Sequence, residues 1–184
     1  MIIALHGAKG SGKDEFYRLV QTIFPDLYVR KVAYADPIKD EICNIFDLQT
    51  EYQYDQFKRS DVTYQLPGYI THVIPGRHVV REIGMLMRSY DESQFVKYVE
   101  RRIKIDDDAV WFITDCRFQN EVDSVKQMGG IIVKIKRDVA SYDGHVTETE
   151  IADTDCDFVI ENNGTIEEFS DRIATFLNLI LESE

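Results

Sequence analysis

The sequence is poor in cysteine and in long apolar runs, and each scarcity excludes a class of protein. Its 184 residues include three cysteines, Cys43, Cys116 and Cys156, which are far apart and form no C-x-x-C pair. This spacing predicts neither a disulfide framework nor a structural zinc site, and it fits a reducing compartment. No segment approaches the ~20 apolar residues of a membrane span. The short apolar run at the N-terminus has no basic flank, so we expect a buried strand there and a cytoplasmic protein.

Basic residues are almost absent from the C-terminal quarter. The segment from Asp138 to Glu184 holds 13 acidic residues and one basic residue, Arg172, and so accounts for the whole formal net charge of −12. The preceding residues are electrically balanced. An acidic total argues against binding to a polynucleotide or to an anionic membrane. The balanced part of the chain still allows a small anionic substrate.

Apolar runs bounded by turn residues predict five strands, at about 2–6, 28–35, 110–114, 131–136 and 157–161. Several show little alternation, which is typical of strands covered on both faces. Helical periods lie between them, starting near Lys13, after Asp36-Pro37, over 77–89, 92–104 and 119–128, and at Thr165. Strands alternating with helices predict an α/β/α sandwich around a parallel sheet. Residues 47–75 fit no strong period, and we expect an inserted loop region or short helices there.

The first predicted strand is followed by GAKGSGKD, which has the Gly-x4-Gly-Lys spacing of a phosphate-binding loop. Its glycines let backbone N–H groups turn toward phosphate oxygens, and the next helix adds its positive end. Asp14 stands where Ser or Thr usually supplies a hydroxyl to Mg²⁺. A carboxylate can hold that ion directly or through water, but it repels a triphosphate when the metal is absent. We expect nucleotide contacts from Ala8, Lys9, Gly10, Ser11, Gly12, Lys13, Asp14 and Glu15.

The stretch GRHVVREIGMLMR places three arginines, Arg77, Arg81 and Arg88, on one face of a helix. Gly84 lies in the same stripe, and guanidinium groups beside bare backbone suit a phosphate that approaches closely. The alternative is a solvated basic face that pairs with acidic groups. The opposite side is expected to face the core through Val80, Ile83, Leu86 and Met87.

Asp115 and Arg117 follow the third predicted strand, and Glu121 lies in the next helix. Ligands of parallel sheets bind at the carboxyl ends of the strands. An aspartate there can hold the water shell of Mg²⁺, and an arginine can reach a transferring phosphoryl group. A helix cap with its salt-bridge partner is the alternative. Asp36 and Lys39 form a similar pair after the second strand, where simple capping beside an exposed lysine is the alternative.

Taken together, several motifs resemble the deoxynucleoside monophosphate kinases of tailed bacteriophages, a family within the nucleoside monophosphate kinase group of P-loop kinases. The matches run in order along almost the whole chain: SGKD at 11–14, ADPIK at 35–39, the G…R of IGMLMR at 84–88, DESQF at 91–95, TDCRFQNE at 114–121, GGIIVKIKR at 129–137, HVTE at 145–148 and IENNGTIEEF at 160–169. Glu15 departs from the family, which usually has Thr there, and Phe95 stands where Trp is frequent. Phosphomevalonate and dephospho-coenzyme A kinases share parts of this pattern. A kinase for another small phosphorylated acceptor is therefore one alternative, and a non-catalytic nucleotide switch is another.

The resemblance implies a P-loop kinase fold with a five-stranded sheet in the order 2-3-1-4-5. It implies one domain over residues 1–184 with a substrate-binding insertion at about 37–105. The implied reaction transfers the γ-phosphoryl group of ATP, with Mg²⁺, to a (deoxy)nucleoside 5′-monophosphate. The implied partners are these small nucleotides, in the host cytoplasm if a phage encodes the chain, with no polynucleotide and no membrane. The oligomeric state stays open, with a homodimer as one option.

The residue patterns and the resemblance together assign roles to individual side chains. The expected catalytic residues are Lys13, Arg88, Asp115 and Arg117. Asp14 and Asp115 are the expected metal ligands. The acceptor is expected to contact Asp36, Lys39, Arg77, Arg81, Arg88, Phe95, Arg117 and Glu121. The region around the ATP base is expected to include Arg137, Asn163 and Gly164.

Overall fold

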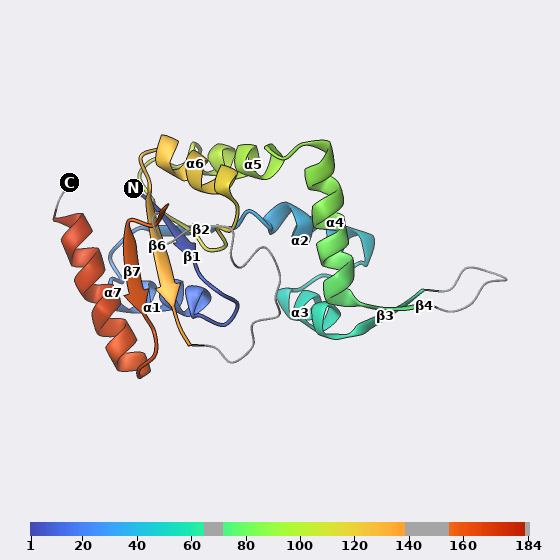
Figure 1. The fold of residues 1–184 in the computed structure, drawn as a ribbon, viewed down its shortest axis with the longest axis horizontal. Coiled ribbons are helices and arrows are strands. Elements are labelled where there is room, and N and C mark those ends of the chain that lie inside the picture. The colour runs from blue at the N-terminus through green and yellow to red at the C-terminus, as the bar shows by residue number, and fades with distance from the viewer. Residues whose placement is uncertain (65–71, 139–154, 183–184) are drawn as a thin grey trace. The chain divides into compact units, whose positions relative to one another are not determined.

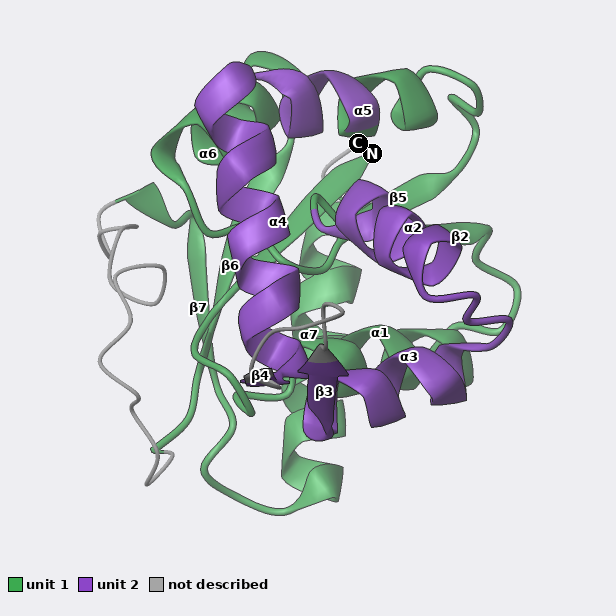
Figure 2. Cartoon of the chain, turned by 90° about the vertical axis from the view of Figure 1, so that its right-hand side faces the viewer, with its two compact units in different colours: residues 1–34, 99–184 green, residues 35–98 purple. Residues whose placement is uncertain are grey.

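The computed structural model describes residues 1–64, 72–138 and 155–182, which form two compact units (Figures 1 and 2). Unit 1 comprises residues 1–34 and 99–184, and unit 2 comprises residues 35–98. Unit 2 overlaps the segment 37–105, whose role as a substrate-binding insertion in a single kinase domain stays a prediction. The HVTE motif at 145–148 lies outside the described residues. Among the described helices, none is both long and apolar enough to cross a membrane.

Unit 1 is built on a five-stranded parallel sheet, as predicted. Its strands are β1 (Ile2–His6), β2 (Val29–Val32), β5 (Val110–Ile113), β6 (Ile131–Lys136) and β7 (Phe158–Glu161). Their spatial order is β2-β5-β1-β6-β7. These labels differ from the expected 2-3-1-4-5 because an unexpected hairpin takes the numbers 3 and 4, and the five sheet strands counted by themselves follow that order. Since all five run parallel, their carboxyl ends share one edge of the sheet.

Helices cover both faces of this sheet (Figure 1). The helices of unit 1 are α1 (Lys13–Ile23), α6 (Gln119–Gln127) and α7 (Ile166–Leu181), and α5 (Gln94–Ile103) begins in unit 2 and ends in unit 1. Alternate strand residues such as Leu5 and Phe112 pack with α1 and α7 in one apolar core. The Phe16 ring lies at its centre, 6.1 Å from the ring of Phe112. The intervening strand residues, such as Ala4, are buried on the opposite face, which α6 covers through Val125.

The helix ends in unit 1 follow the sequence signals. Thr165 Oγ1 accepts a hydrogen bond from Glu168 N at 3.2 Å, and the Glu168 carboxylate accepts one from Thr165 N at 3.0 Å. This reciprocal pair satisfies two backbone donors that a helix otherwise leaves unpaired. It fixes the first turn of α7 directly after the loop that follows β7.

Unit 2 consists of short elements around a small core. They are α2 (Asp36–Ile45), α3 (Glu51–Arg59), β3 (Asp61–Tyr64), β4 (His72–Pro75) and α4 (Gly76–Tyr90). Ile42, Tyr54 and Phe57 form the buried centre, and β3 pairs antiparallel with β4. The expectation of short helices within 47–75 is met by α3. The β3–β4 hairpin is not among the predicted elements.

The core-facing side of α4 agrees only in part with the predicted one. Val80 and Ile83 pack on the small core as expected, together with Val79. Leu86, however, is 57% exposed, so its assignment to the core is wrong. The residues of α4 in this core are Val79, Val80 and Ile83. At about 100° per residue Leu86 lies near Val79 around the helix but about two turns further along it, beyond the part of α4 that packs on the small core.

Candidate active site

The phosphate loop joins β1 to α1 and has the backbone geometry that its glycines predict. Gly7, Gly10 and Gly12 have φ values of 147°, 80° and 107°, which residues with a side chain rarely adopt. A Cβ on Gly7 would lie 2.4 Å from the Ile135 carbonyl oxygen. The loop therefore passes close against β6, and this tight passage leaves no room for a side chain at its first glycine.

The side chain of Asn162, from the C-terminal part of the sequence, closes the phosphate loop by a hydrogen bond to its backbone. Asn162 follows β7, is buried, and donates a hydrogen bond from Nδ2 to the Ser11 carbonyl oxygen at 2.8 Å. A Cβ on Gly12 would lie 2.4 Å from the same Nδ2 atom. The predicted site residues include the neighbouring Asn163 and Gly164 but not Asn162. The available signal was an asparagine directly at the end of a buried strand.

Lys13 folds back along the loop. Its Nζ atom donates to the carbonyl oxygens of Gly7 at 2.5 Å and Ala8 at 2.8 Å. The ammonium is thereby held at the entrance of the loop, where phosphate oxygens can take the place of these carbonyls. Inside the loop, the Ser11 hydroxyl is fully buried and has no hydrogen-bond partner among the described residues. A loop with an ammonium, turned backbone and an unsatisfied hydroxyl fits an anionic group.

The two acidic residues after Lys13 have different surroundings. Asp14 is exposed in the first turn of α1. The Glu15 carboxylate forms an ion pair with Arg18 one turn along α1, and hydrogen bonding to that guanidinium lowers the pKa of Glu15. Glu15 is therefore occupied by a neighbour on its own helix. Its contact with a nucleotide stays a prediction.

The loop after β5 presents Asp115 and Arg117 at the same edge of the sheet. Tyr34 N donates to Asp115 Oδ1 at 2.7 Å, and Arg117 is exposed. Glu121 is only 1% exposed, and its Oε2 atom accepts hydrogen bonds from the backbone N–H groups of Arg117 at 2.8 Å and Phe118 at 3.2 Å. Glu121 thus holds the backbone that carries Arg117, while its predicted contact with the acceptor stays a prediction.

The metal prediction rests on Asp14 and Asp115, both in unit 1. The described residues contain no group of three or more His, Cys, Asp or Glu side chains placed to hold an ion. The prediction is thus of two carboxylates that act together with water and phosphate oxygens. This fits Mg²⁺, which keeps several waters and binds proteins through one or two carboxylates plus substrate phosphates.

The predicted base region lies after β6 and β7. Asn163 and Asp138 bind each other twice, through Asp138 N to Asn163 Oδ1 at 2.8 Å and Asn163 Nδ2 to Asp138 Oδ2 at 3.1 Å. Arg137 and Gly164 flank this pair and are exposed. The pair fixes the ends of both strands beside each other, at the edge that also carries the phosphate loop.

Two of the acceptor-side residues lie on α2 in unit 2. Asp36 is the first residue of α2, and Lys39 lies one turn later. Lys39 Nζ pairs with Glu51 Oε1 at 2.8 Å and lies 5.6 Å from the Tyr54 ring centroid. The lysine is therefore partnered within unit 2, and its contact with an acceptor stays a prediction.

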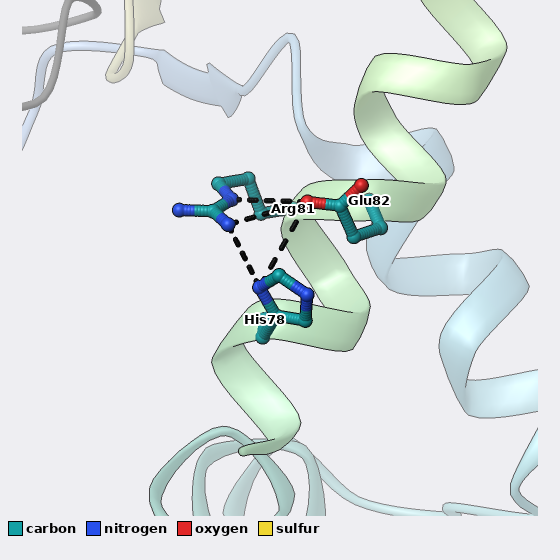
Figure 3. Close-up of polar contacts among 3 residues, drawn as sticks. All are labelled: His78, Arg81 and Glu82. Atoms are coloured by element: carbon teal, nitrogen blue, oxygen red, sulfur yellow. Dashed lines mark hydrogen bonds and ion pairs between the residues drawn. The ribbon is translucent and has the colours of Figure 1, made fainter. Parts of the chain in front are cut away.

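The arginines of α4 do not share one environment. Arg81 donates to His78 Nδ1 at 2.7 Å and to Glu82 Oε1 at 3.2 Å, so its guanidinium is paired on its own helix (Figure 3). The Arg88 guanidinium lies over the buried Phe95 ring, 4.7 Å from its centroid. Arg77 is exposed near the start of the helix. The stacking on Phe95 orients Arg88, whereas Arg81 is oriented by polar neighbours on its own helix.

Gly84 has a different function from the predicted one. It is buried, and a Cβ at this position would lie 2.9 Å from Ile38 Cδ1. Gly84 thus permits close packing of α4 on α2. The expectation of a bare backbone patch open to a phosphate is wrong, because the Ile38 side chain covers it.

One edge of unit 1 therefore gathers most of the predicted site. The phosphate loop, Asp115 with Arg117, and Asn163 with Arg137 follow β1, β5, β7 and β6 at their carboxyl ends. Asp36, Lys39, Arg77, Arg81, Arg88 and Phe95 belong to unit 2. The arrangement in unit 1 matches the place where open α/β sheets bind ligands.

Comparison with known proteins agrees with this architecture. The deoxynucleotide monophosphate kinase family matches residues 83–173. A protein of Acanthamoeba polyphaga mimivirus whose name proposes a deoxynucleotide monophosphate kinase is 28% identical over 193 residues, covering 94% of each chain. The dephospho-CoA kinase from Campylobacter jejuni has the same fold, with a TM-score of 0.56 and 12% identity over 99% of this chain and 98% of that one. The chain is therefore similar to deoxynucleotide monophosphate kinases, and these matches identify it as a phosphotransferase.

Proposed function

We propose that this enzyme transfers the γ-phosphoryl group of ATP to a deoxynucleoside 5′-monophosphate, giving the diphosphate and ADP. The observation that carries the proposal is the closed phosphate loop. Lys13 and turned glycine backbone lie at the edge of the sheet that also presents Arg117. The family match supports a nucleotide as the acceptor.

The chemistry required of the protein is positioning and charge neutralisation. The acceptor is a phosphate monoester that is already ionised at neutral pH, so no strong general base is needed. The loop N–H groups and Lys13 hold the β- and γ-phosphates, and Arg117 stabilises charge on the group in transfer. Asp14 and Asp115 would hold Mg²⁺ together with waters, and the bound ion would supply neutralisation of the phosphate charge. Arg88, oriented by Phe95, binds the phosphate of the acceptor.

The test is a panel of ribo- and deoxynucleoside monophosphates incubated with ATP and Mg²⁺, scored for diphosphate product. We expect at least one deoxynucleotide to be converted faster than its ribose counterpart. Phosphomevalonate and dephospho-coenzyme A belong in the panel as rival acceptors. Conversion of either in place of the nucleotides would reject the proposal, and so would ADP release that is the same with and without any acceptor.

Replacing Arg88 with alanine is expected to impair use of the acceptor. The loss of one charged hydrogen-bonding contact costs about 1.5–3 kcal/mol, which lowers kcat/KM for the monophosphate by roughly tenfold or more. The KM for ATP should change little. Initial rates at varied acceptor concentration measure the effect.

Arg59→Ala is the matched control, because Arg59 is an exposed arginine on α3 in the same unit. It should leave both KM values unchanged. Arg88→Ala with wild-type kinetics would remove Arg88 from the site without affecting the assignment of the phosphate loop.

A further inference from the structure

A buried histidine connects the phosphate loop to the loop after β5. His6 is the last residue of β1, directly before Gly7, and is 3% exposed. Its Nδ1 atom lies 3.0 Å from the carbonyl oxygen of Cys116. A carbonyl only accepts hydrogen bonds, so Nδ1 carries the hydrogen in this contact. The imidazole is thus a donor, and its tautomer is set by Cys116.

Cys116 lies between the two predicted catalytic residues Asp115 and Arg117. Its backbone N–H donates to the Leu5 carbonyl oxygen at 3.2 Å. Both backbone groups of Cys116 are therefore bound by the last two residues of β1. The loop is held elsewhere by Tyr34 and by Glu121. The hydrogen bonds at Cys116 connect the loop after β5 to β1, the strand that continues into the phosphate loop.

The surroundings of His6 favour an uncharged donor. Burial lowers the pKa of His6 and outweighs the hydrogen bond to Cys116, which raises it, and the positive charges of Lys134, Lys13 and Arg117 lower it further. The neutral imidazole holds the Cys116 carbonyl without adding another positive charge beside Lys13 and Arg117. A lysine or arginine at this position would repel both.

We propose that His6 is a positioning residue: its Nδ1–H bond to Cys116 sets the loop bearing Asp115 and Arg117 in register with the phosphate loop. The inference rests on the proposed function, in which Lys13 holds ATP and Arg117 acts on the transferred group. Phosphoryl transfer requires the attacking and leaving oxygens to lie roughly in line and both cationic groups to be placed against the transferred group. A misplacement of about 1 Å costs on the order of 100-fold in rate. Loss of this hydrogen bond should therefore affect turnover more than substrate binding.

Two neutral replacements separate this role from simple filling of space. The side-chain nitrogen of asparagine comes near the position of Nδ1, whereas that of glutamine comes near Nε2. We expect His6→Asn to keep kcat within about threefold of wild type. His6→Gln should lower kcat by about tenfold or more, with the KM values for ATP and acceptor changed by less than about threefold.

Amide hydrogen exchange of the peptide over residues 114–122 gives a readout that needs no activity. His6→Gln should speed exchange in this peptide by about tenfold, while His6→Asn should match wild type. If the wild-type enzyme phosphorylates no nucleotide, the proposed function fails, and the exchange result still decides whether His6 holds the loop. Equal rates and equal exchange in the two variants would overturn the inference. If His6→Gln does not fold, His6→Ser, which is too short to reach Cys116, takes its place with the same expectations.

Discussion

Replacing Lys13 with methionine is expected to lower kcat by about 100- to 1,000-fold, because removal of a single donor that stabilises transition-state charge has an effect of this size. Methionine keeps most of the length of the side chain and removes its charge. In the structure the ammonium is held by the carbonyl oxygens of Gly7 and Ala8 at the start of the loop. A coupled assay of ADP formation with the best acceptor from the panel measures the loss.

Lys104→Met is the control for this variant, because Lys104 is an exposed lysine after α5 in the same unit. It removes the same charge and should leave the rate at the wild-type value. The Lys13 variant should also melt within a few degrees of wild type, since its two lost hydrogen bonds are partly exposed. Wild-type ADP production by the Lys13 variant would refute the assignment of the phosphate loop.

Replacing Gly7 with alanine is expected to destabilise the fold by roughly 2–4 kcal/mol and to abolish nucleotide binding. Two costs combine at this position. The backbone has φ 147°, and the new Cβ would lie 2.4 Å from the Ile135 carbonyl oxygen and 2.7 Å from Ser11 Oγ. The nearest of these atoms belongs to the backbone of a central strand and cannot rotate away. Denaturant unfolding measures the loss of stability.

Gly129→Ala isolates the first cost, that of the backbone conformation. Gly129 also has a positive φ, of 73°, but a Cβ there would meet no atom within 4 Å. Its expected destabilisation is about 1–2 kcal/mol, from the backbone conformation alone. If the two variants lose the same stability, the close passage of the loop against β6 has no energetic weight.

The sheet could be predicted because its strands are continuous apolar runs separated by turn residues. Such runs indicate strands that are buried on both faces. Unit 2 was harder for a physical reason. In α3 only Tyr54 and Phe57 are buried, which gives a weak apolar period. Its clearest local signal is the capping box of Thr50 and Gln53. The strands β3 and β4 have four residues each, too few to show alternation.

The residues of the candidate site also differ in how well the sequence predicts them. The phosphate loop could be predicted because its glycines and lysine are neighbours in the chain. Asn162 and His6 could not, because their hydrogen bonds join residues 151 and 110 positions apart and exist only once the sheet has formed. The charge of Glu121 predicted a contact with the acceptor, whereas in the structure its carboxylate accepts hydrogen bonds from backbone N–H groups. Sequence patterns identify which groups suit a phosphate, and tertiary pairing decides which ones hold the others in place.

The bond from Asn162 to Ser11 also has a consequence for synthesis on the ribosome. Ser11 leaves the exit tunnel early, whereas its partner is translated 151 residues later, with the last strand of the sheet. Contacts between such distant residues form late, because the intervening chain must first be ordered. The nascent chain therefore carries its phosphate loop well before β7 is made, and that loop lacks its closing hydrogen bond until β7 docks. A segment that is translated before the rest of the sheet is thus among the last to be completed.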